Sequence, residues 1–135
     1  DPSRSHCPSL GGYVGLEQQA PYSIGFDIEE VERVTPEVAE RVANGRDQSP
    51  PGAPAPAATW CAREAAFKSL RGPDQPQVIP QIWLRDWEKS ESFLTCVFGI
   101  GPLELGTAWI WQNGGEQFAV AIRPLEPHQN ETPSL

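Results

Sequence analysis

Two carboxylates in an alternating segment are the residues of this chain best suited to chemistry. Asp27 and Glu29 lie in residues 22–29, where the pattern of apolar and polar residues predicts a β-strand. Because side chains two positions apart on a strand share a face, the two carboxylates would stand side by side. Two such groups repel each other unless a proton or a cation lies between them, and their oxygens suit a hard divalent ion such as magnesium. The alternative is that both acids belong to the solvated outer face of a strand.

Glu64 and Lys68 form a second pair, four positions apart. Thr59 as N-cap and the residues after it predict a helix over residues 60–70. Residues four apart lie on one line of a helix, so the two side chains would be neighbours. In one interpretation they form an ordinary surface ion pair, which contributes about 0.2–0.5 kcal/mol. In the other, Glu64 is a third metal ligand and Lys68 is a partner for a phosphate or a proton.

Other candidate groups are sparse. His6 lies near the start of the chain, where a lone histidine is usually exposed and inert. The three cysteines are widely spaced and odd in number, which favours buried thiols in a reducing compartment over a disulfide framework or a zinc site. The sequence has neither a Gly-rich phosphate loop nor a Gly-x-Ser-x-Gly elbow. It therefore offers no credible nucleophile of its own.

The helices and strands that must position these residues are indicated by capping residues, prolines and glycines between apolar segments. A short strand is expected at residues 12–16, and Thr35 and Pro36 predict the start of a helix that closes at Asn44. Further strands are expected at residues 78–87, 92–99, 106–112 and 116–123. The pair Asn113-Gly114 predicts a hairpin between the last two. The fold class is therefore α+β, with mostly antiparallel strands packed with two helices.

The 135 residues make a single domain, which we place at residues 1–125, with a Pro-rich loop at 48–58 and a loose polar tail at 126–135. The net charge is -8, from 18 acidic and 10 basic residues, so a nucleic-acid backbone would be repelled. No run of about 18 apolar residues is present, so no membrane span is expected. These features predict a cytoplasmic protein that binds neither nucleic acid nor membrane.

Two segments together resemble the motifs of the 4′-phosphopantetheinyl transferases. Residues 24–29, Ile-Gly-Phe-Asp-Ile-Glu, are similar to the family's Gly-x-Asp-x-Glu segment. Residues 60–70 are similar to its Trp-x-x-Lys-Glu-Ala-x-x-Lys motif, with Arg63 in place of the first lysine. Upstream, Ser5-His6 is similar to a Ser-His segment of the surfactin-synthetase-activating subtype. The resemblance covers most of residues 5–123.

The resemblance implies a reaction between coenzyme A and an apo acyl or peptidyl carrier protein. A serine hydroxyl of the carrier attacks the β-phosphate, the phosphopantetheine arm moves to that serine, and 3′,5′-ADP leaves. By position, Asp27, Glu29 and Glu64 would bind Mg²⁺. Glu64 and Lys68 would be the catalytic residues, with the general base left open between Lys68, Glu64 and Glu29.

The resemblance also implies a coenzyme A site and an incomplete architecture. His6 would contact the 3′-phosphate, and Arg63 and Lys68 would lie near the phosphates; Arg63 keeps the charge of a lysine but cannot serve as a base. Surfactin-type enzymes resemble two such halves in one chain, and this chain has one motif set. It is therefore expected to form a homo-oligomer, or to be a transferase domain of a larger synthase.

Two other functions compete with transfer. The first alternative, which the residues favour less than transfer, is a transferase-like module that binds coenzyme A or a carrier protein without turnover. The second alternative is an α+β interaction domain in which every carboxylate is structural. Incubation with apo carrier protein, coenzyme A and magnesium separates the three, because only a transferase adds mass to the carrier.

Overall fold

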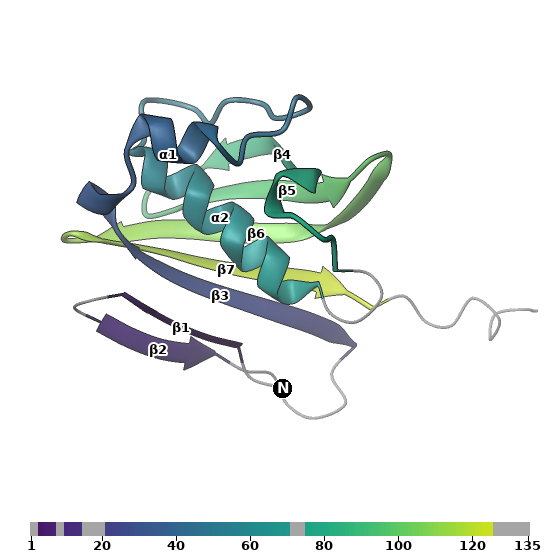
Figure 1. Ribbon diagram of the computed structural model, residues 1–135. Coiled ribbons are helices and arrows are strands. Elements are labelled where there is room, and N and C mark those ends of the chain that lie inside the picture. Colours follow the sequence, from purple (N-terminus) through teal and green to yellow (C-terminus); the bar gives the residue numbers. More distant parts are fainter. Residues whose placement is uncertain (1–2, 8–9, 15–20, 71–74, 126–135) are drawn as a thin grey trace, which may run out of the picture.

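The computed structural model describes residues 3–7, 10–14, 21–70 and 75–125, with the side chains of Arg4, His6 and residues 10–14 left out. A five-stranded antiparallel sheet, in the order β3-β7-β6-β5-β4, carries helix α2 across one face, and a two-stranded hairpin, β1-β2, lies beside β3 (Figure 1). The predicted α+β class is confirmed. The elements are β1 (Ser3–Cys7), β2 (Leu10–Val14), β3 (Tyr22–Glu30), α1 (Pro36–Glu40), α2 (Pro56–Ser69), β4 (Ile82–Lys89), β5 (Leu94–Ile100), β6 (Leu103–Asn113) and β7 (Glu116–Pro124), with 3-10 turns at Val31–Arg33 and Ile79–Gln81.

Helix α2 begins earlier than predicted. Its first residue is Pro56 and its N-cap position is Ala55, so Thr59 is not the cap. Proline suits the first turn because its missing N–H would have no partner there. The Thr59 hydroxyl instead donates to the Pro56 carbonyl at 3.1 Å, inside the first turn. The Pro-rich loop predicted at 48–58 therefore ends at residue 55.

The helix predicted to close at Asn44 ends earlier, at Glu40, but other boundaries follow the sequence more closely. Thr35 caps α1 as expected, because its hydroxyl accepts the Val38 N–H at 3.2 Å. The hairpin of β6 and β7 is confirmed, with Asn113 opposite Glu116 and Gly114 at a φ of +62°, which favours glycine. The strand expected from residue 78 starts at Ile82, after the 3-10 turn. The strand expected at 12–16 begins earlier, and its residues 15–16 lie outside the described residues.

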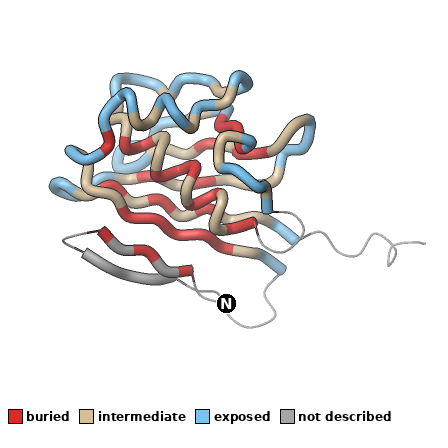
Figure 2. The backbone as a smooth tube through the Cα atoms, viewed as in Figure 1, coloured by how far each residue is buried: buried red, intermediate tan, exposed pale blue. Residues whose placement is uncertain are grey.

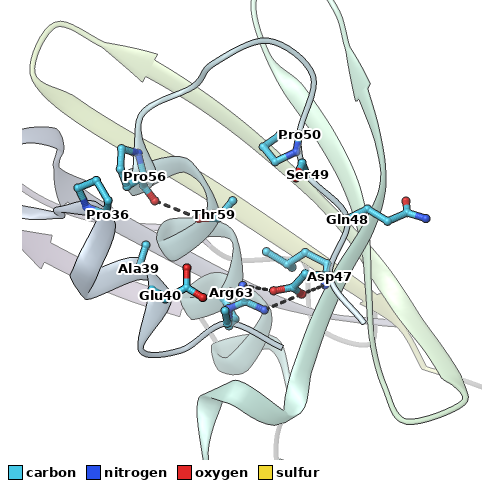
Figure 3. A pocket seen from close by; sticks show the side chains of 12 residues that line it. Pro36, Ala39, Glu40, Asp47, Gln48, Ser49, Pro50, Pro56, Thr59 and Arg63 are labelled. Atoms are coloured by element: carbon cyan, nitrogen blue, oxygen red, sulfur yellow. Dashed lines mark hydrogen bonds and ion pairs between the residues drawn. The ribbon is translucent and has the colours of Figure 1, made fainter. Parts of the chain in front are cut away.

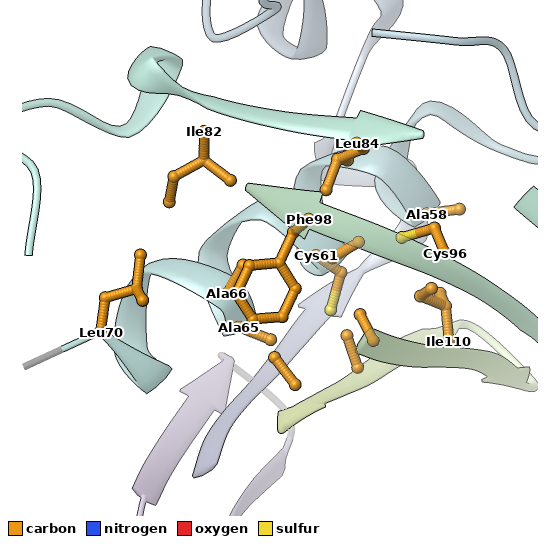
Figure 4. Close-up of a cluster of buried hydrophobic side chains, with 14 residues drawn as sticks. Ala58, Cys61, Ala65, Ala66, Leu70, Ile82, Leu84, Cys96, Phe98 and Ile110 are labelled. Carbon is orange, nitrogen blue, oxygen red and sulfur yellow. The ribbon is translucent and has the colours of Figure 1, made fainter. Parts of the chain in front are cut away.

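Small residues let α2 approach the sheet closely. The buried face of the helix is formed mainly by alanines, with Cys61 and Ser69 among them. A Cβ built on Gly25 of β3 would overlap the Ala65 carbonyl of α2 and lie 2.6 Å from the Ser69 nitrogen. Larger residues, among them the fully buried Phe98, Leu84 and Ile110, pack in the same core cluster as these alanines (Figure 4). Gly25 thus fixes how near β3 lies to the helix.

The free edge of β3 is covered by serine hydroxyls of β1. The Phe26 N–H donates to Ser3 Oγ at 2.8 Å, and the Ile28 N–H donates to Ser5 Oγ at 2.9 Å. Ser3 and Ser5 are two apart on β1, so both point toward β3. Cys7, the next residue of this face, packs with Phe26 and Ile28 in a small apolar cluster. Strand β1 was not predicted.

The opposite edge of the sheet is covered in the same way. Asp47 Oδ1 accepts the Leu84 N–H at 2.9 Å, and Gln48 Oε1 accepts the Asp86 N–H at 2.8 Å. The Gln48 N–H returns a bond of 2.9 Å to the Leu84 carbonyl. Side chains and backbone of one loop therefore satisfy the outer groups of β4.

Along β6 and β7, buried residues alternate with half-buried ones (Figure 2). Trp111 and Phe118 are stacked there, with ring centroids 5.4 Å apart. In the described part of the chain, no helix has the length and apolar character needed to cross a membrane.

Candidate functional site

Asp27 lies at the centre of a polar group between β1, β3 and α2. Its residue exposure is 3%, so it is not part of a solvated strand face. Its Oδ1 atom accepts hydrogen bonds from Lys68 Nζ at 3.0 Å and from Ser5 Oγ at 3.1 Å. Its Oδ2 atom is buried and has no hydrogen-bond partner among the described residues. A buried acceptor of this kind is costly unless a cation or a donor reaches it.

Glu29 lies beside Asp27 and is half-buried. Burial, followed by a hydrogen bond with Asp27 and the Asp27 charge, raises the pKa of Glu29 to about 8. A hydrogen bond from Trp60 and the charge of Lys68 act in the opposite direction but do not cancel the rise. Two adjacent carboxyl groups can share a hydrogen bond only when one holds a proton. The pair is thus arranged to hold either a proton or a cation.

Glu64 belongs to the same electrostatic group. Burial raises the pKa of Glu64; the charge of Lys68 lowers it and the charge of Glu29 raises it. Lys68 forms its ion pair with Asp27, which is 41 positions earlier in the chain. The interpretation of Glu64 and Lys68 as a simple helix-surface pair therefore does not describe this arrangement, because Lys68 links the helix to the strand.

The donor set has the chemistry of a magnesium site, but its geometry is only partly assembled. Carboxylate oxygens are the ligands that hard divalent ions prefer, and among the described residues neither Lys68 nor Ser5 donates to Asp27 Oδ2. Within residues 3–7, 10–14, 21–70 and 75–125, however, no three histidine, cysteine or acidic side chains stand close enough to hold one ion. The convergence of Asp27, Glu29 and Glu64 on a single ion stays a prediction, and it requires side-chain movement.

Arg63 is placed away from this group. Its guanidinium, whose residue is 3% exposed, faces Asp47 with two contacts of 3.1 and 2.9 Å (Figure 3). The same group donates to the Ile82 carbonyl of β4 at 2.6 Å. Its role in this structure is to hold α2 against the edge of β4. The structure does not bring Arg63 together with Lys68, its expected neighbour at the phosphates, or with the carboxylates expected to bind magnesium.

His6 lies in β1 opposite Gly11, and its side chain lies outside the described residues. Its expected contact with the 3′-phosphate of coenzyme A therefore stays a prediction.

Two residues of the site were not assigned a role from the sequence. The Cys61 thiol donates to the Asp27 carbonyl at 3.2 Å, and burial raises the pKa of this thiol well above its usual value. Cys61 therefore stays a protonated donor that fixes the backbone of Asp27 from the helix side. Ser5 reaches the carboxylate of Asp27 from the other side. The alternation of Ser3, Ser5 and Cys7 is the only sequence signal that could have indicated a strand here.

An open cavity of about 500 Å³ adjoins Glu29. Trp60 of α2 forms one wall, so the indole that contacts the Glu29 carboxyl also borders this space. A second cavity of about 320 Å³ lies over Arg63 and Asp47, beside the Pro-rich loop (Figure 3). Of these two cavities, only the first is lined by one of the three predicted metal ligands, Glu29. Its walls are formed by Cys7, Glu29, Glu30, Arg33, Val34, Val38 and Trp60.

Comparison of the chain with models of known protein families and with curated proteins gave no match.

Proposed function

We propose that the chain is a magnesium-dependent 4′-phosphopantetheinyl transferase half-domain, which transfers the arm of coenzyme A to a serine of an apo carrier protein. The observation that carries the proposal is the contact of Lys68 Nζ with Asp27 Oδ1 at 3.0 Å. It joins, across the fold, the two segments whose residues resemble the two family motifs. The raised pKa of Glu29 beside Asp27 adds support, because such a crowded acid pair favours binding of a cation.

The proposed transfer forms one bond and breaks one. The serine oxygen of the carrier bonds to the β-phosphorus of coenzyme A, the bond from that phosphorus to the oxygen that bridges the two phosphates breaks, and 3′,5′-ADP leaves with that bridging oxygen. The serine proton passes to a base. When bound by Asp27, Glu29 and Glu64, magnesium would neutralise charge on the pyrophosphate.

Two tasks remain for the residues of the chain: stabilising charge on the transferring phosphate and accepting the serine proton. Lys68 is already the positive member of an ion pair, which suits charge stabilisation near the transferring phosphate. Glu64 is half-buried with a raised pKa, which brings a carboxylate nearer to the range useful for accepting a proton at neutral pH. Because Glu64 is also a proposed magnesium ligand, the general base stays open between Lys68, Glu64 and Glu29.

The proposed partners are coenzyme A, an apo acyl or peptidyl carrier protein, and a second wall for the site. A single motif set supplies one side of the family's cleft, so we expect either self-association or a neighbouring domain to supply the other. Because the net charge is -8, an acidic carrier would have to be recognised through local contacts. Sedimentation of the purified chain tests self-association: a stable monomer at micromolar concentration contradicts it.

Transfer is tested directly by mass spectrometry of the carrier. The purified chain is incubated with apo carrier protein, coenzyme A and magnesium, and the carrier is expected to gain the mass of one phosphopantetheine arm. Glu64→Gln serves as the matched inactive variant. A wild-type chain that is folded, binds magnesium and coenzyme A, and yet leaves every tested carrier unmodified contradicts the proposal.

The same experiment tests the non-catalytic alternative. That alternative is favoured by one observation: the ion pair of Lys68 occupies Asp27 and the three acids do not yet converge on one point among the described residues. Binding of coenzyme A without any mass change on the carrier would support it.

A further inference from the structure

The Ser5 hydroxyl forms hydrogen bonds with two groups of β3 at once. Its oxygen accepts the Ile28 N–H at 2.9 Å, and its proton is directed to Asp27 Oδ1 at 3.1 Å. A serine hydroxyl has a single proton, so donation to Asp27 uses its whole donor capacity. The residue is buried, with 7% exposure, and water therefore competes little for these bonds. Ser5 is fixed by the backbone of β3 and in turn fixes the carboxylate.

Ser3 provides an internal comparison on the same strand. It lies two positions earlier, is buried with 4% exposure, and its oxygen accepts the Phe26 N–H at 2.8 Å. It makes the same edge contact to β3 as Ser5, and its described hydrogen bond does not involve Asp27. Replacing each serine in turn therefore distinguishes the effect of attaching β1 to β3 from the effect of the bond to the Asp27 carboxylate.

The two donors to Asp27 differ in how firmly they are held. Lys68 approaches Oδ1 from a long side chain that is 31% exposed, whereas Ser5 is short and buried. Both donors act on Oδ1, and the buried Oδ2 receives neither. If Lys68 turns away to meet a phosphate, the bond from Ser5 still holds Oδ1 in its present position.

We propose that Ser5 is a positioning residue for Asp27: by holding Oδ1, it keeps Oδ2 oriented toward a hard divalent cation when Lys68 turns to a phosphate. The inference rests on the proposed function only in naming magnesium as that cation. Partners that orient a metal ligand typically contribute about 10–100-fold in metal affinity. Loss of the Ser5 hydroxyl is therefore expected to weaken Mg²⁺ binding by that factor.

The experiment compares Mg²⁺ titrations of the wild-type chain, Ser5→Ala and Ser3→Ala by calorimetry, without coenzyme A or carrier protein. Both variants lose one buried bond to the edge of β3, so both are expected to unfold at lower temperature. Only Ser5→Ala is expected to lose Mg²⁺ affinity, by about 10–100-fold. Ser5→Thr retains the hydroxyl and, where its thermal unfolding shows that it folds, is expected to recover affinity.

The outcomes separate the inference from the proposed function. Equal Mg²⁺ affinity in all variants overturns the role of Ser5 and leaves the proposed transferase intact. An equal loss in Ser3→Ala and Ser5→Ala also overturns it, because attachment of β1 would then be the cause. A wild-type chain that binds no Mg²⁺ overturns both. If Ser5→Ala does not fold, the other two variants still decide. A loss of Mg²⁺ affinity in Ser3→Ala contradicts the inference. Mg²⁺ affinity that is retained in both Ser3→Ala and folded Ser5→Thr supports it.

Discussion

Gly25 of β3 lies so close to α2 that a methyl group in its place would come within 2.6 Å of the Ser69 nitrogen. This contact explains the glycine of the Gly-x-Asp-x-Glu segment in physical terms. Only a residue without Cβ lets the strand approach the helix, and Asp27 and Lys68 meet because it does so.

Gly25→Ala is therefore expected to lower the free energy of unfolding by about 1–3 kcal/mol, the usual cost of overpacking a core. It should also weaken Mg²⁺ binding, because it separates Asp27 from the helix. Urea unfolding and calorimetry measure the two effects. Gly45→Ala is the matched control, since a Cβ there meets no atom within 4 Å. Equal stability of the two variants would show that the β3–α2 contact is looser than described.

Glu64→Gln is expected to change activity more than stability, whereas Lys68→Ala is expected to lower both, because it removes the ion-pair partner of the buried Asp27 carboxylate. Each removes a charge from the proposed transfer site, and loss of one such interaction typically lowers turnover on the order of 10²-fold or more. Turnover is followed by the mass gain of the carrier, and folding by thermal unfolding. Transfer at the wild-type rate by both variants would remove these residues from the catalytic assignment.

The pH dependence of the rate separates the possible bases. A carboxylate base such as Glu64 must lose its proton, so the rate should rise with pH as Glu64 ionises, and Glu64→Gln should remove this rise. An essential Lys68 base would also need to become neutral, and the rate would then rise with pH even in Glu64→Gln. A purely electrostatic Lys68 would give a fall in rate where the ammonium group is lost.

The raised pKa of Glu29 predicts how stability varies with pH. Between the usual glutamate pKa of 4.5 and the folded value of about 8, the folded chain keeps a proton that the unfolded chain has released. Stability should therefore fall as pH rises through this range. Glu29→Gln should flatten the dependence in chemical denaturation. Magnesium should flatten it too, because the ion replaces the proton, and proton release on adding Mg²⁺ is a direct measure. An unchanged slope in Glu29→Gln would assign the titration to another group.

Arg63→Lys restores the residue type of the family motif but is expected to destabilise this chain. Lysine keeps the charge and loses the two-point contact with Asp47 and the bond to Ile82. A loss of about 1.5–3 kcal/mol follows from the typical value of hydrogen bonds to charged groups. Arg46→Lys is the exposed control, expected to change stability by less than about 0.5 kcal/mol. Mg²⁺ affinity should be unchanged in both, and a selective gain in Arg63→Lys would return this position to the site.

Local patterns in the sequence predicted much of the fold. The cap of α1 at Thr35 and the hairpin after Asn113 were predictable because each depends on a few adjacent residues. The start of α2 was misplaced because Pro56 was assigned to the loop, although proline is also favoured in the first turn of a helix.

The candidate site was predictable only as a set of residues. Asp27 and Glu29 were correctly placed on one strand, but the contact of Asp27 with Lys68 depends on how a strand and a helix meet 41 positions apart. For the same reason Arg63 was expected near phosphate, whereas its partner Asp47 lies in a loop with no pattern that indicates pairing. Long-range partners of this kind do not follow from spacing along the chain.

The covered edges of the sheet have a consequence for self-assembly of the protein. The N–H groups of Phe26 and Ile28 are already bound by Ser3 and Ser5, and those of Leu84 and Asp86 by Asp47 and Gln48. A strand from another molecule could add at either edge only after displacing these side chains. The arrangement therefore protects the chain against edge-to-edge aggregation and amyloid growth, and loss of the serines of β1 would open one of the two routes to it.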